Sequence, residues 1–180
     1  MRGSILLAVG LCWVVLFPTV VHAEVKNVGD GGFQLVITRE CPGSVSECQR
    51  AFLGEVSHWW LADHTYSRDS NNMAFDMQRR CLQETLPDDG FVRHMEIKQY
   101  HPGKRVVLTG GMGPLQEMGL QGAMTIQWAA TETGCQVQLK YNVSGYSPAG
   151  FQELAPVVDM VLTQQLESYQ KHCQKFKSDE

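Results

Sequence analysis

The chain has 180 residues, of which 43% are hydrophobic and 19% are charged, and its formal net charge is −4 at pH 7. This length is enough for one domain with a hydrophobic core. We expect no nucleic-acid partner, because phosphate binding needs clustered basic residues and the sequence has no long basic run.

Residues 1–23 have the layout of a secretory signal peptide. Arg2 precedes the apolar residues 5–21, and Val21 and Ala23 occupy the −3 and −1 positions of a cleavage site. A membrane anchor is the alternative, but the apolar run is shorter than the roughly 20 residues that a spanning helix needs. We expect cleavage after Ala23, export to the periplasm or the medium, a single domain over residues 24–180, and no stable membrane insertion of that domain.

The elements that follow alternate between strand-like and helical patterns. Residues 33–40 are predicted to form a strand, and residues 41–60 one or two short helices that break at Gly54. Short strands are then predicted at 71–78, 81–86, 91–100, 104–110, 120–130 and 135–143, separated by the turn sequences PDDG, HPGK and TETG. This spacing predicts an antiparallel meander. The clearest alternation has one apolar face made of Cys135, Val137, Leu139, Tyr141 and Val143.

Residues from 147 to about 176 are predicted to form one long amphipathic helix. Pro156 either kinks this helix or separates a short first turn from its main part. The order of elements indicates an α+β fold, in which a curved antiparallel sheet of about seven strands is covered by the long C-terminal helix. Space between sheet and helix suits an apolar ligand.

Several sequence blocks carry a resemblance to a known family. The blocks are HWW, HTYS, RHMEI, HPGKRVVLTGGMGPLQEMGLQGAMTIQW, LKYNVSGY and VVDMVLTQQLESY. Together they resemble bacterial, often exported members of the SRPBCC family, which are START-like and polyketide cyclase/dehydrase-like proteins, over residues 33–173. The resemblance implies the helix-grip fold and a hydrophobic cavity. It does not imply one activity, since members include lipid binders, cyclases or hydratases, and co-chaperone-like modules.

The cysteines that follow the signal peptide are Cys41, Cys48, Cys81, Cys135 and Cys173. Export would place them in an oxidising compartment, and their odd number leaves at least one without an intramolecular partner. The fold implied by the resemblance brings the short helices to the end of the long helix and pairs the first strand with the last. It therefore implies two disulfides, Cys48–Cys173 and Cys41–Cys135.

The segment SHWWLADHTYS, residues 57–67, admits three interpretations. His58, Asp63 and His64, with His94, are candidate metal ligands, but no helical H-x-x-x-H pair or H-E-x-x-H motif occurs, so no metal or other cofactor is predicted. His64 and His94 are candidate general bases, yet no nucleophile elbow accompanies them. The interpretation that we favour is the wall of a pocket.

The glycine-rich segment 109–122 is the other unusual block. A phosphate-binding loop would continue with Gly-Lys-Ser/Thr, and this one does not. It is more simply an irregular turn between two strands, with Met112 either at a cavity mouth or in the core.

We therefore predict that the protein binds a hydrophobic or amphipathic small molecule, lipid-like or polycyclic and aromatic, between sheet and helix. A cyclase- or hydratase-type enzyme and an interaction module with a filled cavity are the alternatives, and the oligomeric state is left open. The polar anchors are predicted to be His64 and His94, and the walls to be Trp59, Trp60, Tyr66, Met112, Met124 and Trp128.

Overall fold

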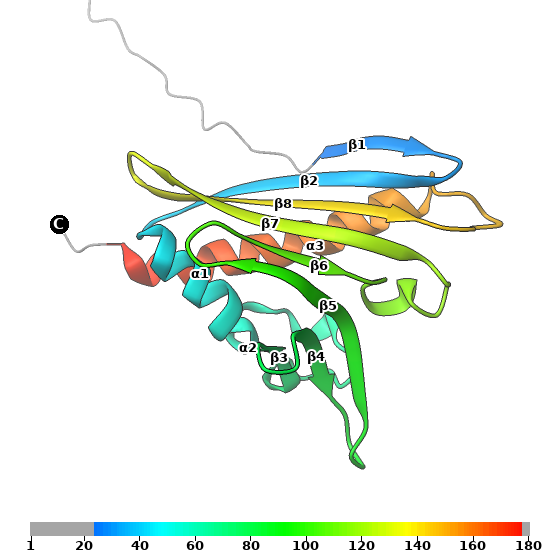
Figure 1. Cartoon of the computed structure of the whole chain (residues 1–180), viewed down its shortest axis with the longest axis horizontal. Coiled ribbons are helices and arrows are strands. Elements are labelled where there is room, and N and C mark those ends of the chain that lie inside the picture. The colour runs from blue at the N-terminus through cyan, green and yellow to red at the C-terminus, as the bar shows by residue number, and fades with distance from the viewer. Residues whose placement is uncertain (1–23, 178–180) are drawn as a thin grey trace, which may run out of the picture.

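A computed structural model describes residues 24–177 (Figure 1), so the predicted signal peptide lies outside the described residues. The helices are α1 (Val45–Gly54), α2 (Val56–Trp59) and α3 (Leu154–His172), with short 3₁₀ turns at Ala62–His64, Ser70–Asn72, Gly113–Leu115 and Cys173–Phe176. The strands are β1 (Glu24–Gly29), β2 (Gly32–Cys41), β3 (Met73–Asp76), β4 (Cys81–Thr85), β5 (Phe91–His101), β6 (Arg105–Thr109), β7 (Gln121–Thr131) and β8 (Gly134–Ser144).

The strands form one antiparallel sheet in the order β1-β2-β8-β7-β6-β5-β4-β3. Figure 1 shows α3 lying along one face of β2, β8 and β7, while β5 curves away toward β4 and β3. Irregular register at two places in β5 accounts for much of this bend, since β-bulges increase local twist and curvature. The predicted α+β helix-grip fold is confirmed.

The sheet has eight strands where about seven were predicted, and the additional strand is β1. Its six residues, EVKNVG, lack the regular alternation of apolar and polar residues that indicates a strand. It forms because the turn at residues 30–31 returns the chain along the free edge of β2, where backbone groups are available for pairing.

The core lies between the sheet and α3. In β8, Cys135, Val137, Leu139, Tyr141 and Val143 are all buried, as the alternation predicted, and β2 buries every second residue in the same way. An aromatic cluster joins the three helices to the sheet: the ring of Phe52 contacts those of Trp59, Trp128 and Tyr169 at centroid distances of 4.7, 5.5 and 5.0 Å.

The helix α3 begins at Leu154, later than the predicted start at residue 147. The segment before it contains Pro148 and Gly150, and Gly150 has a φ of +76°, which ends any helical continuation. Pro156 then lies in the first helical turn, where backbone N–H groups have no intrahelical partner, so it removes no hydrogen bond. Pro156 therefore neither kinks the helix nor separates a first turn from it, because it lies within the first turn of α3. No helix in the described part of the chain is long and apolar enough to cross a membrane.

Four buried cysteines gather where β2, β8, α1 and the end of α3 meet. Cys41 lies directly opposite Cys135 across the β2–β8 pair, and Cys48 and Cys173 are close enough to the thiol of Cys41 to raise its pKa. Cys135 is likewise close enough to the thiol of Cys48 to shift its pKa. Each predicted pair is thus close, but all five described cysteines are free thiols, and the predicted disulfides Cys48–Cys173 and Cys41–Cys135 are absent. The four thiols meet in one group, in which Cys41 and Cys48 each have more than one cysteine neighbour, and no two of them are bonded.

Candidate ligand-binding cavity

A cavity of about 330 Å³ lies between the sheet and the N-terminal half of α3. Its helix side consists of aliphatic side chains spaced three or four residues apart, namely Leu154, Val157, Val158, Val161 and Leu162. This spacing places them on one face of a helix. The volume lies within the range typical of small-molecule sites, which runs from about 300 to about 1,000 Å³.

The opposite side of the cavity includes the glycine-rich loop between β6 and β7. Gly122 is required there, because a Cβ atom would lie 2.4 Å from the ring of Tyr141. The Tyr141 hydroxyl donates to the carbonyl oxygen of Gly110 and accepts from the backbone N–H of Met112, both at 3.1 Å. This buried tyrosine therefore holds Met112 and the following turn against the cavity.

The polar end of the cavity contains His94, which a bulge in β5 turns inward. Leu82 pairs with Met95 and the next residue, Gln83, pairs with Arg93, so His94 has no partner on β4. A bulge of this kind redirects one side chain, and here it buries two consecutive residues, His94 and Met95. The side-chain amide of Gln116 donates to the carbonyl oxygens of Arg93 and His94, at 2.6 and 2.8 Å, and fastens the bulge to the loop.

His94 is paired with a fully buried carboxylate. Its Nε2 lies 3.1 Å from Oε2 of Glu84, which also accepts the backbone N–H of Tyr66 at 3.1 Å, while Oε1 of Glu84 accepts that of Ser67. Burial raises the pKa of Glu84, but the hydrogen bonds from Ser67, Tyr66 and His94 outweigh it and hold that pKa below its usual value. Glu84 is therefore ionised at neutral pH although it is inaccessible to solvent.

Burial lowers the pKa of His94 below its usual value, and the attraction of Glu84 only partly opposes this. His94 is thus neutral at pH 7. Because a carboxylate can only accept hydrogen bonds, Nε2 carries the proton and Nδ1 is left as an acceptor. The pair can orient the polar end of a ligand. It also has the two parts of a general-base site, namely an imidazole, His94, and a carboxylate that positions it, Glu84.

The mouth of the cavity is apolar and accessible. The rings of Tyr66 and His94 stack with centroids 6.0 Å apart, and Tyr66, Met118 and Val157 are 44%, 46% and 52% exposed. At the same rim, Nε2 of His64 hydrogen-bonds with Oε1 of Gln164 at 2.9 Å. The rim next to the polar pair therefore carries exposed apolar side chains, and Asp63 also lines this part of the cavity.

The structure brings five of the eight predicted site residues to the cavity: Trp60, His64, Tyr66, His94 and Met112. The other three are core residues. Trp59 and Met124 line a void of about 10 Å³, which is the size of one water molecule, and Trp128 packs edge-on against Phe52. They lie deeper in the core, where Trp59, Met124 and Trp128 are only 1%, 2% and 5% exposed.

Sequence reasoning missed Glu84. A signal was present, since Glu84 is two residues from Leu82 in a predicted strand and so shares its face. An acidic residue on the buried face of a strand is expected only where it has partners. Those partners, the N–H groups of Tyr66 and Ser67 and the bulged His94, are properties of the tertiary structure.

Comparison with solved structures found the same fold in proteins of low sequence identity. The protein MLL2253 from Mesorhizobium loti has a TM-score of 0.57 at 15% identity, over 82% of this chain and 99% of that one. SSP2350 from Staphylococcus saprophyticus has a TM-score of 0.54 at 10% identity, over 78% and 91%. The di-domain ARO/CYC StfQ from the steffimycin biosynthetic pathway has a TM-score of 0.53 at 12% identity, over 81% of this chain and 52% of that one.

No family model matches the sequence, and no curated protein matches it. Identities this low establish the fold alone. The chain is accordingly an α+β helix-grip protein, and it has an apolar cavity with a buried histidine–carboxylate pair at one end.

Proposed function

We propose that the protein binds a hydrophobic or amphipathic small molecule, lipid-like or polycyclic and aromatic, in the cavity between the sheet and α3. The observation that carries this proposal is the combination of an aliphatic helix face with one buried polar pair, His94 and Glu84, at the end of a 330 Å³ space. Apolar walls supply affinity by burial, and a few fixed polar groups supply orientation.

The exposed apolar rim supports a binding protein that exchanges its ligand with the surroundings. Tyr66, Met118 and Val157 would be an unfavourable surface if the cavity were permanently empty, and a bound apolar molecule would cover them in part. An interaction module with a filled cavity is the less supported alternative, since the space between sheet and helix is open.

The test combines a fluorescent apolar probe, N-phenyl-1-naphthylamine, with a pair of matched substitutions on α3. Val161 lines the cavity, whereas Met160 is 53% exposed and does not. We expect Val161→Trp to fill the cavity and lower probe affinity by at least about tenfold, and Met160→Trp to leave it unchanged. Equal affinity in both variants would place the probe elsewhere and refute the proposal.

Native mass spectrometry of protein purified from its own host then identifies the ligand. An adduct that dissociates on denaturation, and that is reduced in Val161→Trp, would be the natural cargo. Absence of an adduct together with absence of probe binding would refute a carrier function.

A second candidate, a cyclase- or hydratase-type enzyme, is favoured by the His94–Glu84 pair itself. In this function Nδ1 of His94 would accept a proton from the ligand, and Glu84 would hold the imidazole in the required tautomer. His94→Gln would then abolish conversion of the ligand identified above while its binding persists. A ligand unchanged both in mass and in chromatographic retention after incubation with the wild-type protein would exclude this candidate.

We also propose that the protein is an exported bacterial member of the SRPBCC family, cleaved after Ala23. The apolar run at residues 5–21 and the Val21/Ala23 spacing support this. The intact mass of the protein recovered from the periplasm or medium should correspond to residues 24–180. Recovery of the full 180-residue mass from the cytoplasm would contradict it.

A further inference from the structure

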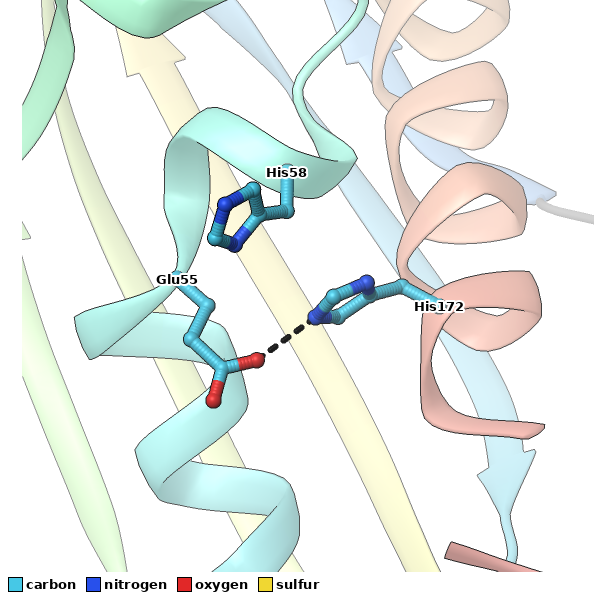
Figure 2. A group of neighbouring side chains, drawn as sticks. All are labelled: Glu55, His58 and His172. Atoms are coloured by element: carbon cyan, nitrogen blue, oxygen red, sulfur yellow. Dashed lines mark hydrogen bonds and ion pairs between the residues drawn. The ribbon is translucent and has the colours of Figure 1, made fainter. Parts of the chain in front are cut away.

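The structure places three potential metal ligands together at the end of the molecule away from the cavity mouth. Glu55 begins the turn into α2, His58 follows within α2, and His172 is the last residue of α3 (Figure 2). One ligand atom from each lies within 4.8 Å of the other two. Figure 2 shows the Glu55 carboxylate and the two imidazole rings directed toward a common space.

The local folds of two helices hold this arrangement. Glu55 and His58 are three residues apart around one helical turn, which brings their side chains to the same side of α2. The ring of His58 stacks on that of His172, with centroids 5.8 Å apart and an interplanar angle of 28°. The packing of α2 against α3 thus presents two imidazoles and one carboxylate to one point.

The hydrogen bonds within the group compete with one another. Nε2 of His172 lies 2.7 Å from Oε2 of Glu55 and 3.0 Å from the ammonium nitrogen of Lys175, which also contacts Oε2 of Glu55. A single imidazole nitrogen cannot both donate to Glu55 and accept from Lys175. Nε2 of His172 and Oε2 of Glu55 therefore both face the ammonium group of Lys175. A metal ion that accepts a lone pair from each of these two atoms would satisfy both.

We propose that Glu55, His58 and His172 bind one divalent transition-metal ion, for which Zn²⁺ is the appropriate probe. Two imidazoles and a carboxylate are a ligand set that suits Zn²⁺, and three protein ligands leave a fourth position for water. Tetrahedral ligands stand about 3.3 Å apart around Zn²⁺, so small side-chain rotations from the present positions are sufficient.

The surroundings suit an ion in this position. Arg50 donates to the other carboxylate oxygen of Glu55, at 3.0 Å, and fixes its orientation as outer-shell groups commonly do. Lys175 occupies the place of the ion as a competing cation. It can move away because it is 41% exposed, and its ammonium lies 5.1 Å from the ring centroid of Phe176, which provides an alternative contact.

The test is calorimetric titration of Zn²⁺ into the chelator-treated protein. We expect one ion per chain, and a loss of affinity of at least about tenfold in both His58→Ala and His172→Ala. The control is His101→Ala, because His101 lies at the end of β5, outside the group. Its affinity for Zn²⁺ should equal that of the wild type.

Lys175→Met separates a metal site from a purely structural ion pair, and it does not depend on the stability of the histidine variants. Removal of the competing ammonium should raise the affinity for Zn²⁺ at least about threefold. Co²⁺ should give a visible d–d absorption that both histidine variants lose. Failure of the wild type and Lys175→Met to bind stoichiometric Zn²⁺, or binding unaffected by either histidine substitution, would overturn the proposal.

Discussion

Replacement of Glu84 by Gln tests whether the buried carboxylate organises the polar end of the cavity. The substitution preserves the size of the side chain but leaves one acceptor oxygen instead of two. In the structure Oε2 accepts from Tyr66 N–H and His94 Nε2, and Oε1 accepts from Ser67 N–H. Whichever way the amide is turned, its NH₂ group meets at least one backbone N–H, so two donors face each other.

The expected loss of stability follows from these contacts. A hydrogen bond to a charged group contributes about 1.5–3 kcal/mol, and a buried donor without a partner costs about 1–3 kcal/mol. Removal of a buried charge recovers part of its desolvation penalty. We therefore expect Glu84→Gln to reduce the free energy of unfolding by about 2–4 kcal/mol.

Urea denaturation measures this change as a lower midpoint at an unchanged m-value. The matched control is Glu96→Gln, since Glu96 is exposed and its ion pair is with Lys98 on the same strand. It should change stability by less than about 0.5 kcal/mol. A loss below about 0.5 kcal/mol for Glu84→Gln as well would refute the organising role of the carboxylate.

Three further predictions concern stability. The pKa values of His94 and Glu84 are both below their usual 6.5 and 4.5, so the folded state binds fewer protons than the unfolded state. Stability should therefore be complete above pH 6.5 and decline as the pH falls below it. Between pH 6.5 and 4.5, above the range in which the lowered pKa of Glu55 contributes, constant urea midpoints would mean that the His94 shift is absent. Tyr169→Phe removes the 2.8 Å hydrogen bond to the carbonyl oxygen of Cys48 and should cost about 1–2 kcal/mol by the same assay; an unchanged midpoint would mean that this bond contributes nothing. Ser44→Ala removes the N-terminal cap of α1 and should cost about 1 kcal/mol, visible as a lower thermal midpoint, while a midpoint equal to the wild type would contradict the capping.

Local pattern was sufficient for most of the fold. The alternation of residues 135–143 predicted which face of β8 is buried, because neighbouring strand residues point to opposite faces whatever the sheet packs against. The apolar stripe on the C-terminal segment predicted the helix that covers the sheet, because residues three or four apart lie on one face of a helix. β1 was not predictable in this way, since its residues show no regular alternation and it forms by pairing along β2.

The site depended on information that no local pattern contains. His94 faces the cavity because β5 is bulged against β4, a matter of register between strands. Glu55 and His172 meet although they are 117 residues apart. Four cysteines gather as free thiols where two disulfides were predicted. Sequence by itself determined which faces are apolar and which segments form helices or strands, since these follow from residue type and period. Only the tertiary structure decided which polar groups converge, because convergence depends on sheet curvature and helix packing between residues distant in the chain.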